Sequence, residues 1–175
     1  MSGIGFHRLT TGGVAQKLIN LTLAGLKAAL DEDCAAWLES GLEAQGMSLD
    51  AFFSYVGGRI GHAENIYDPS TPNIQTNAVT GLGLASIDIA VNLRGSFGSS
   101  SAAGTNDGRI RANTDRARVF ILLHEFGHLL EIPGFRSDRG NPVGGSANNR
   151  QVEQNCSRTL NRFDGSRQWD WRKKL

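Results

Sequence analysis

The residues best suited to chemistry form the stretch His124-Glu125-Phe126-Gly127-His128. On an α-helix, residues four apart project from one face about a turn from each other, so the two imidazoles can share one metal ion. Glu125 lies about 100° around the helix from His124 and can reach a water molecule held by that ion. Neutral imidazoles suit Zn²⁺, and a carboxylate beside an open coordination position serves as a general base. The motif therefore predicts a zinc site with His124 and His128 as ligands and Glu125 as catalytic base.

The flanking residues predict that this motif lies on a buried helix. Asn113, Thr114 and Asp115 provide a cap and an acidic first turn, residues 119–130 are mainly apolar, and Pro133-Gly134 end the helix. A helix that places ligands inside a fold should stop soon after the second one, so that the chain can return with a third. The alternative interpretation is a pair of hydrogen-bonded core histidines without a metal.

Three acidic residues after the motif are candidates for the third ligand. Glu131 follows on the same helical face, but ligands on one straight helix cannot all converge on one ion with tetrahedral geometry. Glu153 lies 25 residues after His128, in a segment that we expect to be a helix capped by Ser146. Asp138 lies ten residues after His128, on a loop that returns just past the helix end. We favour Asp138 and keep Glu153 as the alternative.

Length and charge limit the class of protein. The 175 residues are most economically one domain, 1–175. The net charge is +1 and no apolar run approaches the length of a membrane span, so we expect neither nucleic acid nor a membrane as a partner. The first residues lack the charged start and apolar stretch of a signal peptide. We therefore expect either a cytosolic protein or a module of a larger exported protein.

Cys34 and Cys156 are too few for a disulfide framework. Both lie in segments with a helical pattern, where a free buried thiol behaves as a small hydrophobe. A bridge between them would clamp the N-terminal helical segment to the C-terminal one in an exported protein. Because the compartment decides between these states, the sequence leaves the pairing open.

Three helices are predicted before the motif. Residues 14–30 carry apolar side chains at near-helical spacing, and 31–33 cap a second helix over 34–41. A third helix begins at Ser48, a good cap, and ends at Gly57-Gly58. Their apolar faces are expected to form the outer wall of the core.

The middle of the chain is predicted to consist of loops on either side of one strand. Residues 58–80 are polar, which predicts a loop with one short strand at most, and His62 within it is expected to be exposed. Residues 86–94 alternate apolar with polar or small side chains, which predicts a half-buried strand. Residues 95–108 hold too little apolar content to pack, so we expect either a substrate-covering flap or disorder. Residues 109–111 are a candidate for one more short strand.

A longer block of residues resembles a known group of enzymes. The motif from His124 to His128 looks like that of the zincin superfamily of metallopeptidases. The block also resembles uncharacterised bacterial metallopeptidase domains, some of which end repeat-rich exported proteins. The positions that carry this resemblance are His124 to His128, Ile132-Pro133, Ser137-Asp138, Asn148-Asn149, Val152, Asn155-Cys156 and Cys34 to Leu38.

The resemblance implies an α+β, zincin-like fold. N-terminal helices, a small twisted and mostly antiparallel sheet over the active-site helix, and a C-terminal helix are expected. The acidic residue of the Ser137-Asp138 pair looks like the fixed one in these domains, and its spacing is similar to that of aspzincins. Glu153 would suit a gluzincin arrangement instead. The strict metzincin motif is excluded, since it would need glycine at position 131 and histidine at position 134.

The resemblance implies a zinc-dependent endopeptidase whose substrate is a peptide or protein. Glu125 would take a proton from the attacking water and return it to the leaving amine. A second oxyanion donor stays unassigned, with His62 or an arginine as candidates. The alternatives are a hydrolase of another amide or ester, and a metallopeptidase-like effector or toxin module paired with an inhibitor or immunity protein. A binding domain with structural zinc is disfavoured, because such a site has no use for Glu125.

Overall fold

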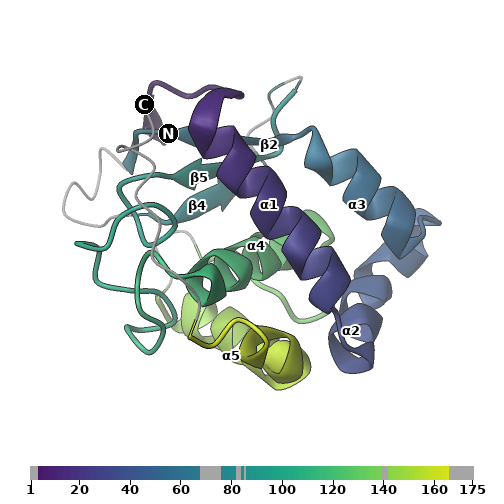
Figure 1. The fold of residues 1–175 in the computed structure, drawn as a ribbon. Coiled ribbons are helices and arrows are strands. Elements are labelled where there is room, and N and C mark those ends of the chain that lie inside the picture. The colour runs from purple at the N-terminus through teal and green to yellow at the C-terminus, as the bar shows by residue number, and fades with distance from the viewer. Residues whose placement is uncertain (1–3, 68–75, 82–83, 85, 139–141, 166–175) are drawn as a thin grey trace.

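The computed structural model describes residues 4–67, 76–81, 84, 86–138 and 142–165. After β1, three helices and a 3₁₀ turn come first along the chain, then four strands, then two more helices (Figure 1). The helices are α1 (Gly13–Ala29), α2 (Glu32–Leu42), the 3₁₀ turn η1 (Glu43–Gln45), α3 (Leu49–Gly57), α4 (Asp115–Leu129) and α5 (Pro142–Asn161). The strands are β1 (Gly5–His7), β2 (Ile60–Ala63), β3 (Asn65–Tyr67), β4 (Ala78–Thr80) and β5 (Ile89–Asn92).

Two small sheets are present in the described part of the chain. The three-stranded sheet has the order β2-β5-β4, in which β2 runs parallel to β5 and β4 runs antiparallel to it. The two-stranded sheet pairs β1 with β3 in antiparallel fashion. The fold is therefore α+β as expected, and the sheet nearest α4 is mixed. β4 lies at an edge of that sheet and contacts α4.

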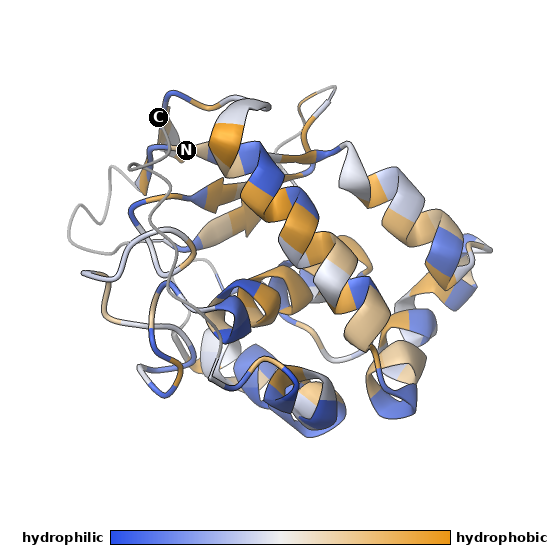
Figure 2. Cartoon of the chain, viewed as in Figure 1, coloured by the Kyte–Doolittle hydropathy of each residue, from blue (hydrophilic) through white to orange (hydrophobic). Residues whose placement is uncertain are grey.

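Helix α4 is the central element of the core. It packs against α1, α2, α5 and β4, so nearly its whole surface is covered. Figure 1 shows α4 between the sheet and α5, with α1 crossing in front, and Figure 2 shows that α4 is mostly apolar while α5 is largely hydrophilic. A helix that is covered on nearly all sides is expected to carry apolar residues on most of its faces, as α4 does. Within the described residues, no helix is both long and apolar enough to cross a bilayer.

Side-chain caps begin three of the helices where the sequence indicates. Asp31 accepts hydrogen bonds from the backbone N–H groups of Asp33 and Cys34 at the start of α2. Ser48 accepts from the third residue of α3, and Thr114 accepts from Ala117 in α4. Each cap satisfies an N–H group that the first helical turn leaves without an intrahelical partner. The predicted starts of these helices are confirmed.

Helix α5 begins earlier than predicted. Ser146, the expected cap, lies inside the helix, which starts at Pro142. Cys156 of α5 forms a disulfide with Cys34 of α2, across a sequence separation of 122 residues. Next to this bridge, the Thr159 hydroxyl donates to the buried Asp31 carboxylate at 2.6 Å. The bridge and this hydrogen bond thus join the start of α2 to the C-terminal half of α5.

The expectation of a loop over 58–80 is wrong for much of its described part, since this segment contains β2, β3 and β4. His62 lies in β2, is only 7% exposed, and its Nε2 atom lies 3.0 Å from the Gly12 carbonyl oxygen. The prediction of an exposed loop histidine is therefore wrong. Pairing with β5 satisfies the backbone of β2 and β4, pairing with β1 satisfies that of β3, and no local sequence pattern indicates these pairings.

The prediction that residues 86–94 form a half-buried strand is wrong about burial. Strand β5 is buried at every position because both of its faces are covered. Ile89 and Val91 face the helices, whereas Ala90 packs in a second cluster with Ile66 of β3. A central strand covered on both faces needs no alternation of polar and apolar residues.

The long loop 95–108 packs against the core, contrary to the expectation that it could not. Phe97 is fully buried, and its carbonyl oxygen accepts a hydrogen bond from Arg118 Nε at 3.1 Å. Thr105 pairs with Ile110 in an isolated β-bridge, which replaces the predicted strand over 109–111. One aromatic side chain and one buried guanidinium therefore order a segment of low apolar content.

Candidate metal centre

His124 and His128 project from the same face of α4, one turn apart. Their Nε2 atoms lie 3.2 Å from each other, and their rings meet edge to face with centroids 5.0 Å apart. The side chains are 13% and 20% exposed, so the ring nitrogens lie in a shallow, partly covered depression. This is the geometry that four-residue spacing on a helix dictates.

Asp138 completes the group from the loop that follows α4. Its Oδ2 atom lies 2.8 Å from His124 Nε2 and 3.3 Å from His128 Nε2. One ligand atom from each of the three residues lies within 4.8 Å of the other two, and no second such cluster of His, Cys, Asp or Glu occurs in the described residues. The structure therefore brings together the three residues that the sequence analysis selects.

These three atoms suit a small divalent cation. Tetrahedral Zn²⁺ with bonds of about 2.0–2.1 Å places its ligand atoms roughly 3.3 Å apart, close to the 2.8–3.3 Å separations in this group. Three lone pairs that converge so closely need positive charge between them, which a proton or a metal ion supplies. Hydrogen bonds from His124 and His128 outweigh burial and lower the pKa of Asp138 below its usual range.

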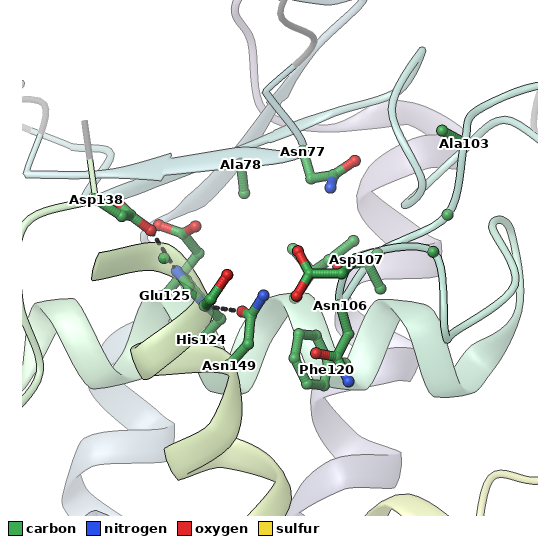
Figure 3. Close-up of a pocket in the computed structure, with 16 residues that line it drawn as sticks. Asn77, Ala78, Ala103, Asn106, Asp107, Phe120, His124, Glu125, Asp138 and Asn149 are labelled. Atoms are coloured by element: carbon green, nitrogen blue, oxygen red, sulfur yellow. Dashed lines mark hydrogen bonds and ion pairs between the residues drawn. The ribbon is translucent and has the colours of Figure 1, made fainter. Parts of the chain in front are cut away.

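Asn149 on α5 orients the first histidine. Its Oδ1 atom lies 2.9 Å from His124 Nδ1, so an amide oxygen faces that ring nitrogen (Figure 3). An acceptor there keeps the proton on Nδ1 and leaves the Nε2 lone pair for a metal. Burial would lower the pKa of His124, but Asp138 and the charge of Glu125 raise it above the usual value.

The loop after α4 is held in place by Phe135 and Asn148. The Phe135 ring meets both histidine rings edge to face, with centroid distances of 5.4 Å to His124 and 4.9 Å to His128. A Cβ atom on Gly127 would lie only 2.5 Å from this ring, which explains the glycine within the motif. Buried Asn148 accepts from the backbone N–H of Arg136 at 2.9 Å and donates to its carbonyl at 2.7 Å. These contacts fix the loop that carries the third acidic residue.

Glu125 is buried beside the group and held by the edge strand. The Thr80 hydroxyl of β4 forms a short hydrogen bond with the Glu125 carboxylate. Burial raises the pKa of Glu125 above its ordinary value, although His124, Thr80 and His128 act in the opposite direction. A carboxylate with a raised pKa is a stronger base when ionised, as a proton acceptor in catalysis requires.

Two hollows meet at Glu125 and Asp138. The first, of about 730 Å³, lies between β4, the loop 103–108, the N-terminal half of α4 and α5 (Figure 3). The second, of about 630 Å³, lies along β4 and the C-terminal end of α4. Together they give the candidate centre access from both directions along the sheet edge.

The competing acidic residues lie elsewhere. Glu153 accepts a hydrogen bond from Asn106 Nδ2 at 2.5 Å and pairs with Arg109 at 3.4 Å, so it binds the 95–108 loop instead of the histidines. Glu131 follows the end of α4 and lines the second hollow without joining the group. His62 lines neither of the two hollows, which leaves it without access to a substrate at this centre.

No family model, curated protein or solved structure matches this chain. Its function therefore has to be argued from the residues of the site.

Three residues that shape the site were not predicted from the sequence. Thr80 and Asn149 contact Glu125 and His124, and Asp107 lines the first hollow. Asn149 belongs to a pair that carries the family resemblance, which was a usable signal. Thr80 and Asp107 lie in polar segments, where only the tertiary fold indicates which side chains point toward the helix.

Proposed function

We propose that this protein is a zinc-dependent endopeptidase. His124, His128 and Asp138 are the ligands, and Glu125 is the general base. The observation that carries the proposal is the convergence of three ligand atoms within 4.8 Å directly beside a buried, ionisable glutamate. Three protein ligands leave a fourth position for water or substrate, which distinguishes catalytic zinc from structural zinc. A zinc ion in this place supplies Lewis-acid activation of a water nucleophile and of the carbonyl that it attacks.

The chain's own residues account for the proton transfers. Glu125 accepts a proton from the attacking water as the new C–O bond forms, and donates it to the amine nitrogen as the C–N bond breaks. Thr80 holds the carboxylate in place between these steps. Water adds across one amide bond, so each turnover yields one carboxylate and one amine.

The sheet edge provides a place for an extended substrate. β4 is hydrogen-bonded to β5 on one side, and its other side borders the two hollows at Glu125. An extended peptide can add to such an edge as a further strand, with its backbone fixed along the strand. An edge strand beside a helix that carries two histidines is also what a zincin-like fold requires, so we include that fold in the proposal.

The Cys34–Cys156 disulfide supports an extracellular or periplasmic setting. Disulfides persist in oxidising compartments and are rare in the reducing cytosol. We therefore place the enzyme in an exported protein or an exported module of one.

The proposal is tested by hydrolysis of an unfolded protein substrate by the zinc-loaded chain. We expect cleavage that a chelator removes and zinc restores. Glu125→Gln should bind zinc normally and lose at least 1,000-fold in kcat, or about 4 kcal/mol of barrier. Esters and non-peptide amides are assayed in parallel. Cleavage of those compounds alone would contradict the endopeptidase assignment. Full activity in Glu125→Gln would show that Glu125 is not the general base.

A further inference from the structure

The first hollow contains an acidic side chain that the proposed mechanism does not use. Asp107, Glu125 and Asp138 are the acidic residues of its described lining, and that described lining contains no lysine or arginine. Glu125 and Asp138 already belong to the proposed centre. Figure 3 shows the Asp107 side chain directed into the hollow from the 103–108 loop, opposite Asn149. An unused carboxylate at this place is suited to bind a cationic group of a substrate.

The residues on either side of Asp107 are held by contacts with α5, and the Asp107 side chain itself is 59% exposed. Asn106 and Asp107 both adopt the left-handed conformation, with φ of 53° and 56°, and Gly108 continues it at 81°. Asparagine and aspartate adopt this region more readily than other non-glycine residues, so their side chains suit this turn. Glu153 of α5 holds the turn, because it binds both Asn106 and Arg109. The loop is therefore shaped before any ligand arrives.

The nearest identified cation makes only a long ion pair with Asp107. Arg109 Nη2 lies 4.0 Å from the Asp107 carboxylate, at the limit of an ion pair. The same guanidinium donates to Asn106 Oδ1 at 3.1 Å and to the Asn106 carbonyl at 3.3 Å, and it pairs with Glu153. The Arg109 guanidinium therefore makes its closer contacts with Asn106 and Glu153.

The rest of the hollow fits an aliphatic stem. Phe120 and Ile121 of α4 and Ala78 of β4 form apolar parts of the lining. Lysine and arginine combine an apolar stem with a charged end, and they bury the stem where the end can reach an anion. A neutral side chain would fill the same walls but leave Asp107 with only the distant Arg109 as a partner.

The direction of β4 assigns the position of this side chain in the substrate. Ala78, at the start of the strand, lines the first hollow, whereas Gly81, just past its end, lines only the second. Antiparallel addition is the commoner arrangement of paired strands. A peptide laid antiparallel to β4 would run from the second hollow to the first, so the first receives the residue after the scissile bond.

We propose that the hollow beside the 103–108 loop binds the lysine or arginine side chain that follows the scissile bond, and that Asp107 binds its cation. This inference rests on the proposed function, because it names a substrate class for the same site. It makes the enzyme one that cleaves on the amino side of basic residues.

Peptide binding tests the hollow without requiring catalysis. Zinc-loaded Glu125→Gln is titrated with two fluorescent peptides, one of which has lysine where the other has norleucine. Both peptides are N-acetylated, so that no α-amine competes with the lysine side chain for Asp107. We expect about tenfold tighter binding of the lysine peptide, decreasing with added salt. The preference should vanish in the Glu125→Gln, Asp107→Asn double variant and persist when Asp50→Asn is combined with Glu125→Gln instead. Asp50 carries the same charge on α3, where its side chain is 85% exposed. Asparagine also tolerates the left-handed backbone, so the loop should keep its shape.

Cleavage mapping tests the assigned position. A mixed peptide library is digested and the new N-termini are identified by mass spectrometry. The wild-type chain should release products that begin with lysine or arginine, and Asp107→Lys should shift the preference toward glutamate. Equal binding of lysine and norleucine peptides, an unchanged preference in the Asp107 variant, or cleavage after basic residues would overturn the inference even if peptides are hydrolysed. If the lysine peptide binds more tightly but the wild-type chain hydrolyses no peptide, the hollow binds basic side chains as inferred and the proposed function is wrong.

Discussion

The Thr80 hydroxyl on β4 donates a hydrogen bond to the carboxylate of Glu125 on α4. The same oxygen lies 3.4 Å from the Glu125 backbone carbonyl oxygen. One side chain therefore ties the edge strand, where an extended peptide would add, to the proposed base. A peptide positioned by β4 is thereby positioned relative to Glu125 as well.

Thr80→Val should lower kcat by about ten- to 100-fold while leaving zinc content unchanged, since a hydrogen bond to a charged group contributes roughly 1.5–3 kcal/mol. Losing the bond also removes an effect that lowers the pKa of Glu125. The acid limb of the kcat/KM profile should therefore move to higher pH. Thr80→Ser, which keeps the hydroxyl, should restore both values. An unaltered pH profile in Thr80→Val would mean that Thr80 has only a packing role.

Asn149→Ala should weaken zinc binding by about ten- to 100-fold, the usual cost of losing the partner that orients a ligand histidine. The reason is that His124 Nδ1 loses the Oδ1 atom that faces it at 2.9 Å. Competition with a chromogenic chelator measures the affinity. Asn155→Ala is the control, because Asn155 lies on the same helix and donates to the backbone of Gln151. Equal affinities in the two variants would contradict the orienting role.

Zinc affinity should fall as the pH is lowered, starting above pH 6.5. The pKa of His124 is raised from the ordinary value of 6.5, and zinc must displace that proton. Below the raised pKa, each pH unit should cost about tenfold in affinity for one displaced proton. Glu125→Gln removes a charge that raises this pKa, so its affinity should begin to fall at lower pH. Titrations at several pH values check both shifts, and a coincident pH dependence for the two proteins would refute this electrostatic account.

Reduction of the Cys34–Cys156 bridge should destabilise the fold by about 2–5 kcal/mol, because it releases a constraint across 122 residues of sequence. For a chain of this size, that loss corresponds to a fall in Tm of roughly 4–20 °C. Thermal unfolding with and without reductant measures it. The Cys34→Ala, Cys156→Ala double variant is the control, since it should unfold at the lower temperature and not respond to reductant. Identical Tm values for the oxidised and reduced wild-type chain would contradict a bridged native state.

The parts of the fold that follow from local signals could be predicted. Thr114 caps α4 where its side chain and the apolar run indicate, and Ser48 does the same for α3. The helical spacing of His124 and His128 fixes their relation directly. Asp138 required only the further condition that a third ligand return on a loop after the helix end.

The remaining features depend on contacts between distant segments. The burial of His62 comes from pairing of β2 with β5, and the order of the 95–108 loop comes from one buried aromatic residue, Phe97. The sequence of a polar, glycine-rich stretch does not indicate which strand it will pair with or which residues will cover it. Thr80 reaches Glu125 only because β4 crosses over α4, 45 residues earlier in the chain. Such positions become functional candidates only in three dimensions.

Metal content tests the central claim most directly. Each purified variant is dialysed against a fixed free zinc concentration, and its zinc content per chain is measured by inductively coupled plasma mass spectrometry. The account predicts one zinc per chain for the wild type and for Glu153→Gln, and loss of zinc in His128→Ala and Asp138→Ala with circular dichroism spectra unchanged. Full zinc content in Asp138→Ala, or its loss in Glu153→Gln, would contradict the assignment of the three ligands.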